Sequence, residues 1–418
     1  MTLKTSTRCV KFGGTSDPYG AMVPPIYQTA TFRQPTASEF GEYDYTRSGN
    51  PTRSLVEQQL AELEGGTGAC AFASGMAAIT ALTRLVEHGD EIIAGDDLYG
   101  GTVRLLEQIL PRQGVSVRYV DTTKLEAVRA ALTLRTRLIL VETPTNPMLS
   151  ICDIRGLSQI AHESGVMLAV DNSMLSPVLQ QPLALGADVV IHSATKFLSG
   201  HSDVTAGAII TNDPSLYERI AFQQNAEGAA LSPFESWLLL RGLKTLALRV
   251  ERQNDSAWKV VQFLATHKGI KKVYHPGFKD HSGHEIHRSQ SEGDGSVVSF
   301  TTGDEQVSAQ LAEATRLFTI AVSFGSVGST ISLPCRMSHA SIPKTLQDRL
   351  APPADLVRLS VGIEDADDLM EDLGQALDVA TQGRTSVNLV TLMKEGNDSV
   401  DVQVAAKQLP ASCKQSFD

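Results

Sequence analysis

The chain has 418 residues, 42% of them hydrophobic and 20% charged, which is typical of a folded protein with more than one domain and excludes a largely disordered one. The 36 basic residues against 47 acidic ones give a formal charge of −11, which disfavours nucleic-acid binding. No apolar run reaches the roughly 18–20 residues that a membrane-spanning helix needs, so no membrane association is expected. The five scattered cysteines form no CxxC pair and indicate a reducing compartment.

The first segment of the chain, residues 1–45, has irregularly spaced glycines and prolines and no sustained apolar period, so we expect an extended arm. A helix is predicted from Pro51, with Asn50 as its N-cap and Gly65 just beyond its end. The segment shows neither an apolar signal core nor an arginine-rich leader. We therefore expect a cytoplasmic protein, or a plastid protein whose transit peptide has been removed.

Short apolar runs then alternate with amphipathic segments of helical length. This alternation predicts an α/β fold in which residues 46–240 form a large domain around a mainly parallel sheet with helices on both faces. A long helix over 243–266 and shorter strand-like pieces predict a smaller α+β domain over residues 241–384. Residues 385–418 are polar and aperiodic, so we expect a mobile tail. The strands expected in the large domain are 69–73, 91–94, 115–120, 138–141, 166–170, 189–192 and 206–211.

The ends of two expected strands carry the clearest chemistry. One strand leads into Asp171, and the next leads into Ser193, Thr195 and Lys196. In a parallel sheet such strand ends share one edge, where ligands bind. A lysine, an aspartate and two hydroxyls suit a pyridine-ring cofactor with a phosphate, because the lysine can form a Schiff base and the aspartate can hold the ring nitrogen protonated. A structural Asp–Lys ion pair with exposed hydroxyls is the alternative interpretation of this fragment.

Three further segments favour the cofactor interpretation. Gly75 and Met76 open a helix after a strand, where backbone N–H groups bind anions. Arg47, close to Tyr45, lies just before another helix, and a guanidinium can hold a phosphate through two hydrogen bonds. Tyr99 follows a further strand and offers an aromatic face to a ring. Each feature taken alone is also typical of a helix cap, a surface arginine or a core tyrosine.

Taken together, these runs resemble a known family. YDYTRSGNPT, ASGMAA, GDDLYGGT, VETPTNP, VDNS and SATKFLSGHSD, in this order and spacing, resemble the transsulfuration (Cys/Met metabolism) family of pyridoxal-phosphate-dependent enzymes of fold-type I, over roughly residues 9–380. Later runs, including AVSFGSVGSTISLPCRMSHASIP, resemble its plant-type cystathionine β-lyase members. The resemblance implies an aspartate-aminotransferase-like large domain with a seven-stranded sheet, pyridoxal 5′-phosphate as cofactor, and a homo-oligomer. That oligomer is expected to be a dimer of dimers whose active sites are shared between subunits.

The resemblance also implies roles in binding the cofactor. Lys196 attaches the cofactor and moves the substrate protons, and Asp171 pairs with the ring nitrogen. Tyr99 stacks on the ring and accepts a proton from the incoming substrate amine, and Asn146 lies near the phenolic oxygen. The phosphate is expected to be held by Ser193, Thr195, the backbone of Gly75 and Met76, and Tyr45 and Arg47 of a neighbouring subunit.

The substrate implied is a small sulfur amino acid. Arg358, helped by Ser323 and Asn146, is expected to hold its α-carboxylate. Gly328 stands where many γ-acting relatives carry a glutamate, which favours β-elimination. The expected reaction is the cleavage of cystathionine to homocysteine, pyruvate and ammonia in methionine biosynthesis. The alternatives are a lyase for another cysteine S-conjugate or cystine, and a γ-acting relative (cystathionine γ-synthase, cystathionine γ-lyase or methionine γ-lyase).

Other classes of function are disfavoured. A nicotinamide oxidoreductase needs a strand–GxGxxG–helix unit, which we do not find. A binding protein that keeps the cofactor pocket without turnover is a further alternative. Four histidines between 275 and 287 could hold a metal, but an exposed histidine-rich turn is favoured and no metal site is expected.

Overall fold

A seven-stranded sheet forms the centre of the larger part of the molecule. The computed structural model describes residues 3–11, 19–340 and 350–394. The strand order is β1-β7-β6-β5-β4-β2-β3, and only β7 runs antiparallel to its neighbours. The mainly parallel α/β architecture is therefore confirmed. The strands are β1 (Gly68–Phe72), β2 (Glu91–Gly95), β3 (Ser116–Val120), β4 (Thr136–Glu142), β5 (Met167–Asp171), β6 (Val189–His192) and β7 (Gly207–Thr211).

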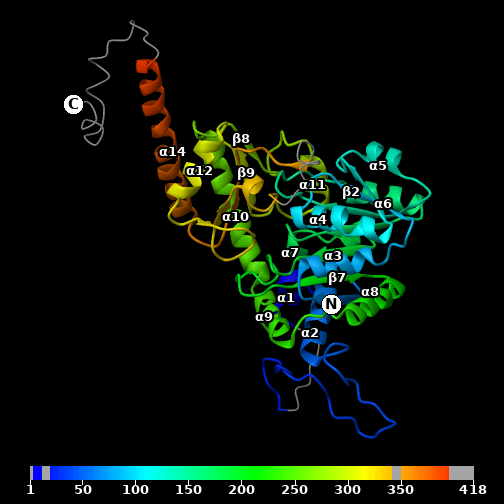
Figure 1. The fold of residues 1–418 in the computed structure, drawn as a ribbon. Coiled ribbons are helices and arrows are strands. Elements are labelled where there is room, and N and C mark those ends of the chain that lie inside the picture. Colours follow the sequence, from blue (N-terminus) through cyan, green and yellow to red (C-terminus); the bar gives the residue numbers. More distant parts are fainter. Residues whose placement is uncertain (1–2, 12–18, 341–349, 395–418) are drawn as a thin grey trace.

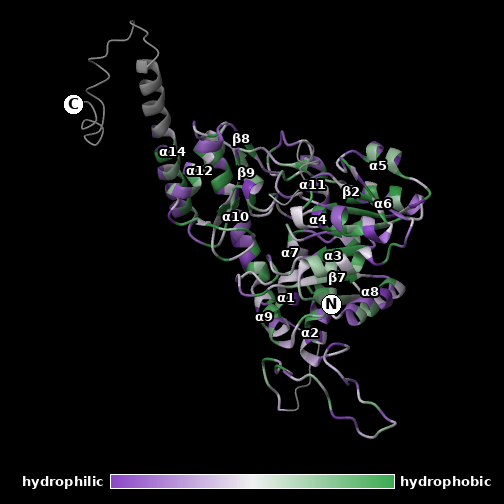
Figure 2. Ribbon diagram, in the orientation of Figure 1, coloured by the Kyte–Doolittle hydropathy of each residue, from purple (hydrophilic) through white to green (hydrophobic). Residues whose placement is uncertain are grey.

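Helices cover both faces of this sheet (Figure 1). In β6, Val190 packs into one buried cluster while Val189 and Ile191 pack into another, because alternate side chains point to opposite faces of a strand. Figure 2 shows helix α3 mainly in white and green, as a helix packed on the sheet requires. The helices are α2 (Pro51–Glu64), α3 (Gly75–Thr83), α4 (Gly100–Gln108), α5 (Leu125–Ala131), α6 (Ile154–Glu163), α7 (Ser176–Leu179), α8 (Pro214–Glu227) and α9 (Pro233–Leu243), with short 3-10 helices at Leu110–Gln113 and Pro182–Leu185.

A second sheet follows in the chain, with the order β10-β11-β12-β9-β8. Its core lies between the strands and the helices α10, α12 and α14, and α12 packs beside α14 at one end of the molecule (Figure 1). Its elements are α10 (Leu246–Thr266), β8 (Lys272–Tyr274), α11 (His284–Gln290), β9 (Val297–Thr301), α12 (Glu305–Ala314), β10 (Thr319–Ile320), β11 (Thr330–Ser332), a 3-10 turn (Pro334–Arg336), β12 (Leu356–Ser360) and α14 (Ala366–Lys394).

Both ends of the chain differ from the expectation. Helix α1 (Thr5–Val10) lies within the predicted arm, and its Cys9 is buried in the core, so the arm is not extended throughout. Helix α1 has six residues and a single buried one, so its sequence shows no helical period of apolar residues that could have predicted it. Residues 19–49 loop away from the body before α2 (Figure 1). At the other end, α14 continues to Lys394, into the predicted tail 385–418, whose residues 395–418 lie outside the described part.

Among the described residues, no helix combines the length and the apolar character that crossing a bilayer requires.

Candidate active site

A cavity of about 420 Å³ lies where the carboxyl ends of β4, β5 and β6 face residues of the second sheet. The structure brings ten of the predicted site residues together around it. A larger cavity lies elsewhere in the molecule, but the titratable groups that suit the expected chemistry gather at the smaller one. The predicted residues that line the smaller cavity are Gly75, Met76, Tyr99, Asn146, Asp171, Ser193, Thr195, Lys196, Ser323 and Arg358.

Asp171 ends strand β5, which places its carboxylate at the cavity. The backbone N–H of Ser173 donates a hydrogen bond to its Oδ1 at 2.9 Å. Burial raises the pKa of Asp171, while hydrogen bonds from Ser173 and the charges of His192 and Lys196 oppose that rise. A buried carboxylate of this kind is well suited to a cationic partner, such as the protonated nitrogen of a pyridine ring.

Lys196 lies just beyond β6, and its Nζ donates a hydrogen bond to Oγ of Ser323 at 2.6 Å. The same Nζ lies 4.8 Å from the centre of the Phe324 ring. Burial lowers the pKa of Lys196 to about 8; the positive charge of Arg358 adds to this effect, and Asp171 opposes it. About a tenth of this amine is therefore neutral at pH 7, far more than for an ordinary lysine, and a nucleophile or base must be neutral.

The start of helix α3 forms an anion cradle. Ser74 caps this helix by accepting a hydrogen bond from the N–H of Ala77, which leaves earlier N–H groups for a ligand. A Cβ added to Gly75 would lie 2.9 Å from Cβ of Ser193, so only glycine allows this approach. Thr195, also at the cavity, exchanges two hydrogen bonds with the backbone of Ala206, at 3.2 and 2.9 Å. Together with the lysine and the aspartate, this cradle fits pyridoxal phosphate.

Arg358 in β12 supplies a buried cation to the cavity wall. Its Nη1 donates to Oδ1 of Asn146 at 2.7 Å, its Nη2 donates to the carbonyl of Ser323 at 2.8 Å, and its buried Nε has no partner. Ser323 has a φ of 87°, a bend that turns its carbonyl to Arg358 and its hydroxyl to Lys196. Burial lowers the pKa of Arg358 to about 10, and Glu142 opposes that fall. Within the described residues, Arg358 forms no salt bridge, so it suits an incoming carboxylate.

Tyr99 stands at the start of helix α4, with 42% of its surface exposed. Its backbone N–H donates to Oε2 of Glu142 at 3.4 Å. A Cβ on Gly101 would lie 2.4 Å from the Tyr99 ring, which is too close. The ring can therefore occupy this position at the cavity wall only because residue 101 is a glycine. This position suits a ring that covers a flat cofactor.

Two predicted site residues, Tyr45 and Arg47, do not line the cavity of their own chain. Tyr45 is 43% exposed, and the Arg47 guanidinium lies 5.5 Å from its ring. Nε of Arg47 donates to Oδ1 of Asn225 at 3.2 Å. Both residues belong to the segment that precedes α2, away from the sheet edge.

Two further cavity residues that bear on the chemistry, Glu142 and Phe324, were not predicted from the sequence. Glu142 ends β4 directly beside Asp171 in β5, and burial, with the charges of Asp171 and Asp97, raises its pKa well above the usual range. A carboxylate at a strand end was the available signal. The second is Phe324, whose ring centre lies 4.8 Å from Nζ of Lys196 and 5.4 Å from the guanidinium carbon of Arg358. No sequence signal separates such a phenylalanine from a core residue.

The histidine-rich segment does not form the expected exposed turn. His275 and His287 are 1% and 0% exposed, and His287 Nε2 lies 3.0 Å from the carbonyl of Gly293. His287 is buried on helix α11 and His275 just after β8, which the residue spacing did not reveal. No group of histidine, cysteine and acidic side chains in the described residues is arranged to hold a metal ion.

Comparisons with known proteins agree with this geometry. The family model described as "Cys/Met metabolism PLP-dependent enzyme" matches residues 6–378. A chloroplastic cystathionine beta-lyase of Arabidopsis thaliana is 54% identical over 368 residues, which are 88% of this chain and 79% of the relative. A cystathionine gamma-lyase of Bacillus subtilis is 47% identical over 378 residues, 90% of this chain and all of the relative. The crystal structure of cystathionine gamma-lyase from Lactobacillus plantarum complexed with L-serine matches with a TM-score of 0.88 and 41% identity, covering 91% of this chain and 100% of that one. The chain therefore belongs to the pyridoxal-phosphate-dependent enzymes of Cys/Met metabolism, of fold-type I.

Proposed function

We propose that this protein is a carbon–sulfur lyase that cleaves cystathionine by β-elimination to homocysteine, pyruvate and ammonia. The observation that carries the proposal is a buried arginine, Arg358, which has no carboxylate partner among the described residues and lines the same cavity as Lys196. This pair suits an α-amino acid, which offers a carboxylate to the first residue and a Cα proton to the second. The similarity to the Arabidopsis cystathionine beta-lyase supports the choice of substrate.

The proposed mechanism assigns one task to each side chain. Arg358 and Asn146 bind the substrate carboxylate and thereby hold the Cα–H bond toward Lys196. The neutral Nζ of Lys196 removes that proton, and Ser323, which already accepts a hydrogen bond from Nζ, keeps the amine in position. When bound, pyridoxal phosphate supplies an electron sink for the charge that develops at Cα. The same lysine then carries a proton to the departing sulfur.

The remaining residues are proposed to hold the cofactor. Ser193, Thr195 and the N–H groups of Gly75 and Met76 bind the phosphate, with Asp171 at the ring nitrogen. Tyr99 covers one face of the ring and takes up a proton from the substrate amine. Asn146 also lies at the phenolic oxygen.

Whether the elimination takes place at Cβ or at Cγ depends on the groups that hold the part of the substrate farthest from its α-carboxylate. Gly328 stands where the resemblance places a glutamate in many γ-acting relatives, and as a glycine it brings no carboxylate of its own to direct chemistry to Cγ. This supports β-elimination over the γ-acting alternatives. Lysis of cystine or of another cysteine S-conjugate breaks the same kind of bond, between Cβ and sulfur. It stays the second candidate reaction.

We further propose a dimer of dimers with shared active sites. Tyr45 and Arg47 lie outside their own chain's cavity and are chemically suited to a phosphate, so they would complete the site of a neighbouring subunit. Of the two compartments expected, the plastid is supported by the chloroplastic relative.

Steady-state kinetics on cystathionine, cystine, djenkolate, methionine and homocysteine test the proposal. The expected result is the highest kcat/KM on cystathionine with pyruvate as the keto-acid product, and no turnover by Lys196→Ala. Release of 2-oxobutyrate from cystathionine would instead assign the protein to the γ-acting relatives. A higher kcat/KM on cystine or djenkolate would assign it to the lyases of other cysteine S-conjugates.

A further inference from the structure

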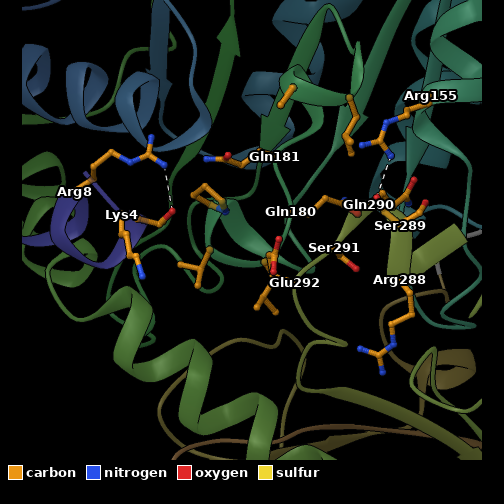
Figure 3. A pocket seen from close by; sticks show the side chains of 16 residues that line it. Lys4, Arg8, Arg155, Gln180, Gln181, Arg288, Ser289, Gln290, Ser291 and Glu292 are labelled. Carbon is orange, nitrogen blue, oxygen red and sulfur yellow. Dashed lines mark hydrogen bonds between the residues drawn. The ribbon is translucent and has the colours of Figure 1, made fainter. Parts of the chain in front are cut away.

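A second cavity, of about 610 Å³, lies away from the candidate active site, between helix α1, helix α7 and the chain that follows α11. Figure 3 shows Lys4 and Arg8 on one side of it and Arg155 and Arg288 on the other. Among its described lining residues, Glu292 is the single acidic one. A cavity of this size can enclose a small molecule.

The cations of this cavity are largely unpaired, although the chain carries 47 acidic residues and a net charge of −11. Arg288 pairs with Asp294 at 3.0 Å. Arg155 donates only to the carbonyl of Ser289, at 3.0 Å, and Arg8 donates to the carbonyl of Glu62 and to Oγ1 of Thr5. Within the described residues neither arginine meets a carboxylate, and Lys4 likewise has no ion pair. Positive charges gathered around one concave site attract an anion.

One residue of the cavity wall, Gln180, is a buried amide. Gln180 is 2% exposed, and its Nε2 donates to the carbonyl of Thr143 at 3.0 Å and to Oδ1 of Asn172 at 3.1 Å. Its Oε1 is buried without a hydrogen-bond partner among the described residues. An unpaired buried acceptor is costly unless water or a ligand donor satisfies it.

We propose that this cavity binds a small organic polyanion, whose acidic groups are held at the two ends by Lys4 and Arg8 and by Arg155 with Arg288. The separation of the cations into two groups favours a ligand with two acidic groups over a single inorganic ion. Carboxylates and phosphates share this chemistry. This cavity takes no part in the proposed lyase reaction, so anion binding there is independent of the lyase activity.

Isothermal titration of the cofactor-loaded enzyme at constant ionic strength tests the proposal, with citrate as the carboxylate probe and fructose 1,6-bisphosphate as the phosphate probe. We expect one site per subunit for at least one probe, and the preferred probe identifies the acidic group. In the double variant Lys4→Gln/Arg155→Gln, affinity should fall at least about tenfold, because both exposed side chains lack ion pairs and their loss leaves the fold intact. Arg155→Glu should abolish binding.

Arg112→Gln is the matched control, since Arg112 is exposed, carries the same charge and does not line the cavity. It should leave the affinity unchanged. The proposal is overturned if neither probe binds, or if binding survives in both Lys4→Gln/Arg155→Gln and Arg155→Glu, which would place the anion elsewhere. An equal loss of affinity in Arg112→Gln would show that general charge, and not this cavity, attracts the probe.

Discussion

The hydrogen bond from Arg358 Nη1 to Asn146 Oδ1, at 2.7 Å, joins the two sheets of the molecule across the candidate active site. Arg358 belongs to β12 of the five-stranded sheet, and Asn146 follows β4 of the seven-stranded sheet. Both side chains are at least 97% buried. The substrate carboxylate is therefore expected to bind where the two parts of the structure already meet.

Replacement of this guanidinium tests its proposed role. Arg358→Lys keeps the charge but loses the planar pair of donors. Because a hydrogen bond to a charged group contributes about 1.5–3 kcal/mol, kcat/KM on cystathionine should fall roughly 10- to 100-fold, mainly through KM. Cofactor absorbance should persist. Arg336→Lys, at an exposed arginine paired with Glu305, is the control and should leave kcat/KM unchanged. Equal losses in both variants would contradict the assignment.

The amine of Lys196 should titrate near pH 8. Attachment of pyridoxal phosphate to the apoprotein needs the neutral amine, so the attachment rate should rise about tenfold per pH unit below that midpoint and level off above it. The visible absorbance of the bound cofactor follows the reaction. Arg358→Met removes a positive charge that lowers the Lys196 pKa, and should move the midpoint to higher pH. A midpoint near the ordinary lysine value in the wild type would refute the effect of burial.

The cofactor part of the site could be predicted from the sequence because its residues follow directly from strand ends and helix starts. Asp171, Lys196 and Gly75 each adjoin a regular element whose period is visible. Glu142 also ends a strand and offered the same signal, whereas Phe324 could not be found in this way, since its importance depends on neighbours from other elements. Burial of the histidine segment and the short helix α1 likewise depend on tertiary packing, which no local pattern reports.

Gly75→Ala should weaken cofactor binding. The new methyl group would lie 2.9 Å from Cβ and 3.1 Å from Cα of Ser193, so the anion cradle must open. We expect the dissociation constant for pyridoxal phosphate to rise at least about tenfold, or about 1.4 kcal/mol, as measured by fluorescence titration of the apoprotein. Gly374→Ala is the control, because its methyl group meets the nearest atom of Phe263 at an ordinary 3.5 Å. Unchanged affinity in Gly75→Ala would mean that the phosphate is held elsewhere.

Sharing of the active site between subunits can be tested by mixing two inactive variants. Arg47→Ala and Lys196→Ala should each be nearly inactive alone. If Arg47 serves the neighbouring site, a mixed dimer contains one site with both residues intact, so an equal mixture should recover about a quarter of the wild-type activity after subunit exchange. Mixing Lys196→Ala with Asp171→Ala is the control, because the resemblance places both residues in the same site of one chain. No recovery in the first mixture would show that Arg47 acts within its own chain.

The buried carboxyl of Glu142 should make the protein less stable at higher pH. Burial and the neighbouring charges of Asp171 and Asp97 raise its pKa in the folded state, so the folded protein binds this proton more tightly than the unfolded chain does. The free energy of unfolding therefore falls as pH rises above the unfolded value of 4.5 toward the folded pKa. Glu142→Gln removes the charge but keeps an acceptor for the N–H of Tyr99, and should raise the melting temperature at pH 8 while leaving it unchanged near pH 4.5. Glu163→Gln, at an exposed glutamate whose pKa is lowered by Gln159 and Arg129, should bring no such gain. A lower melting temperature of Glu142→Gln at pH 8 would instead show that an ionised Glu142 stabilises the site, with Arg358 as its partner.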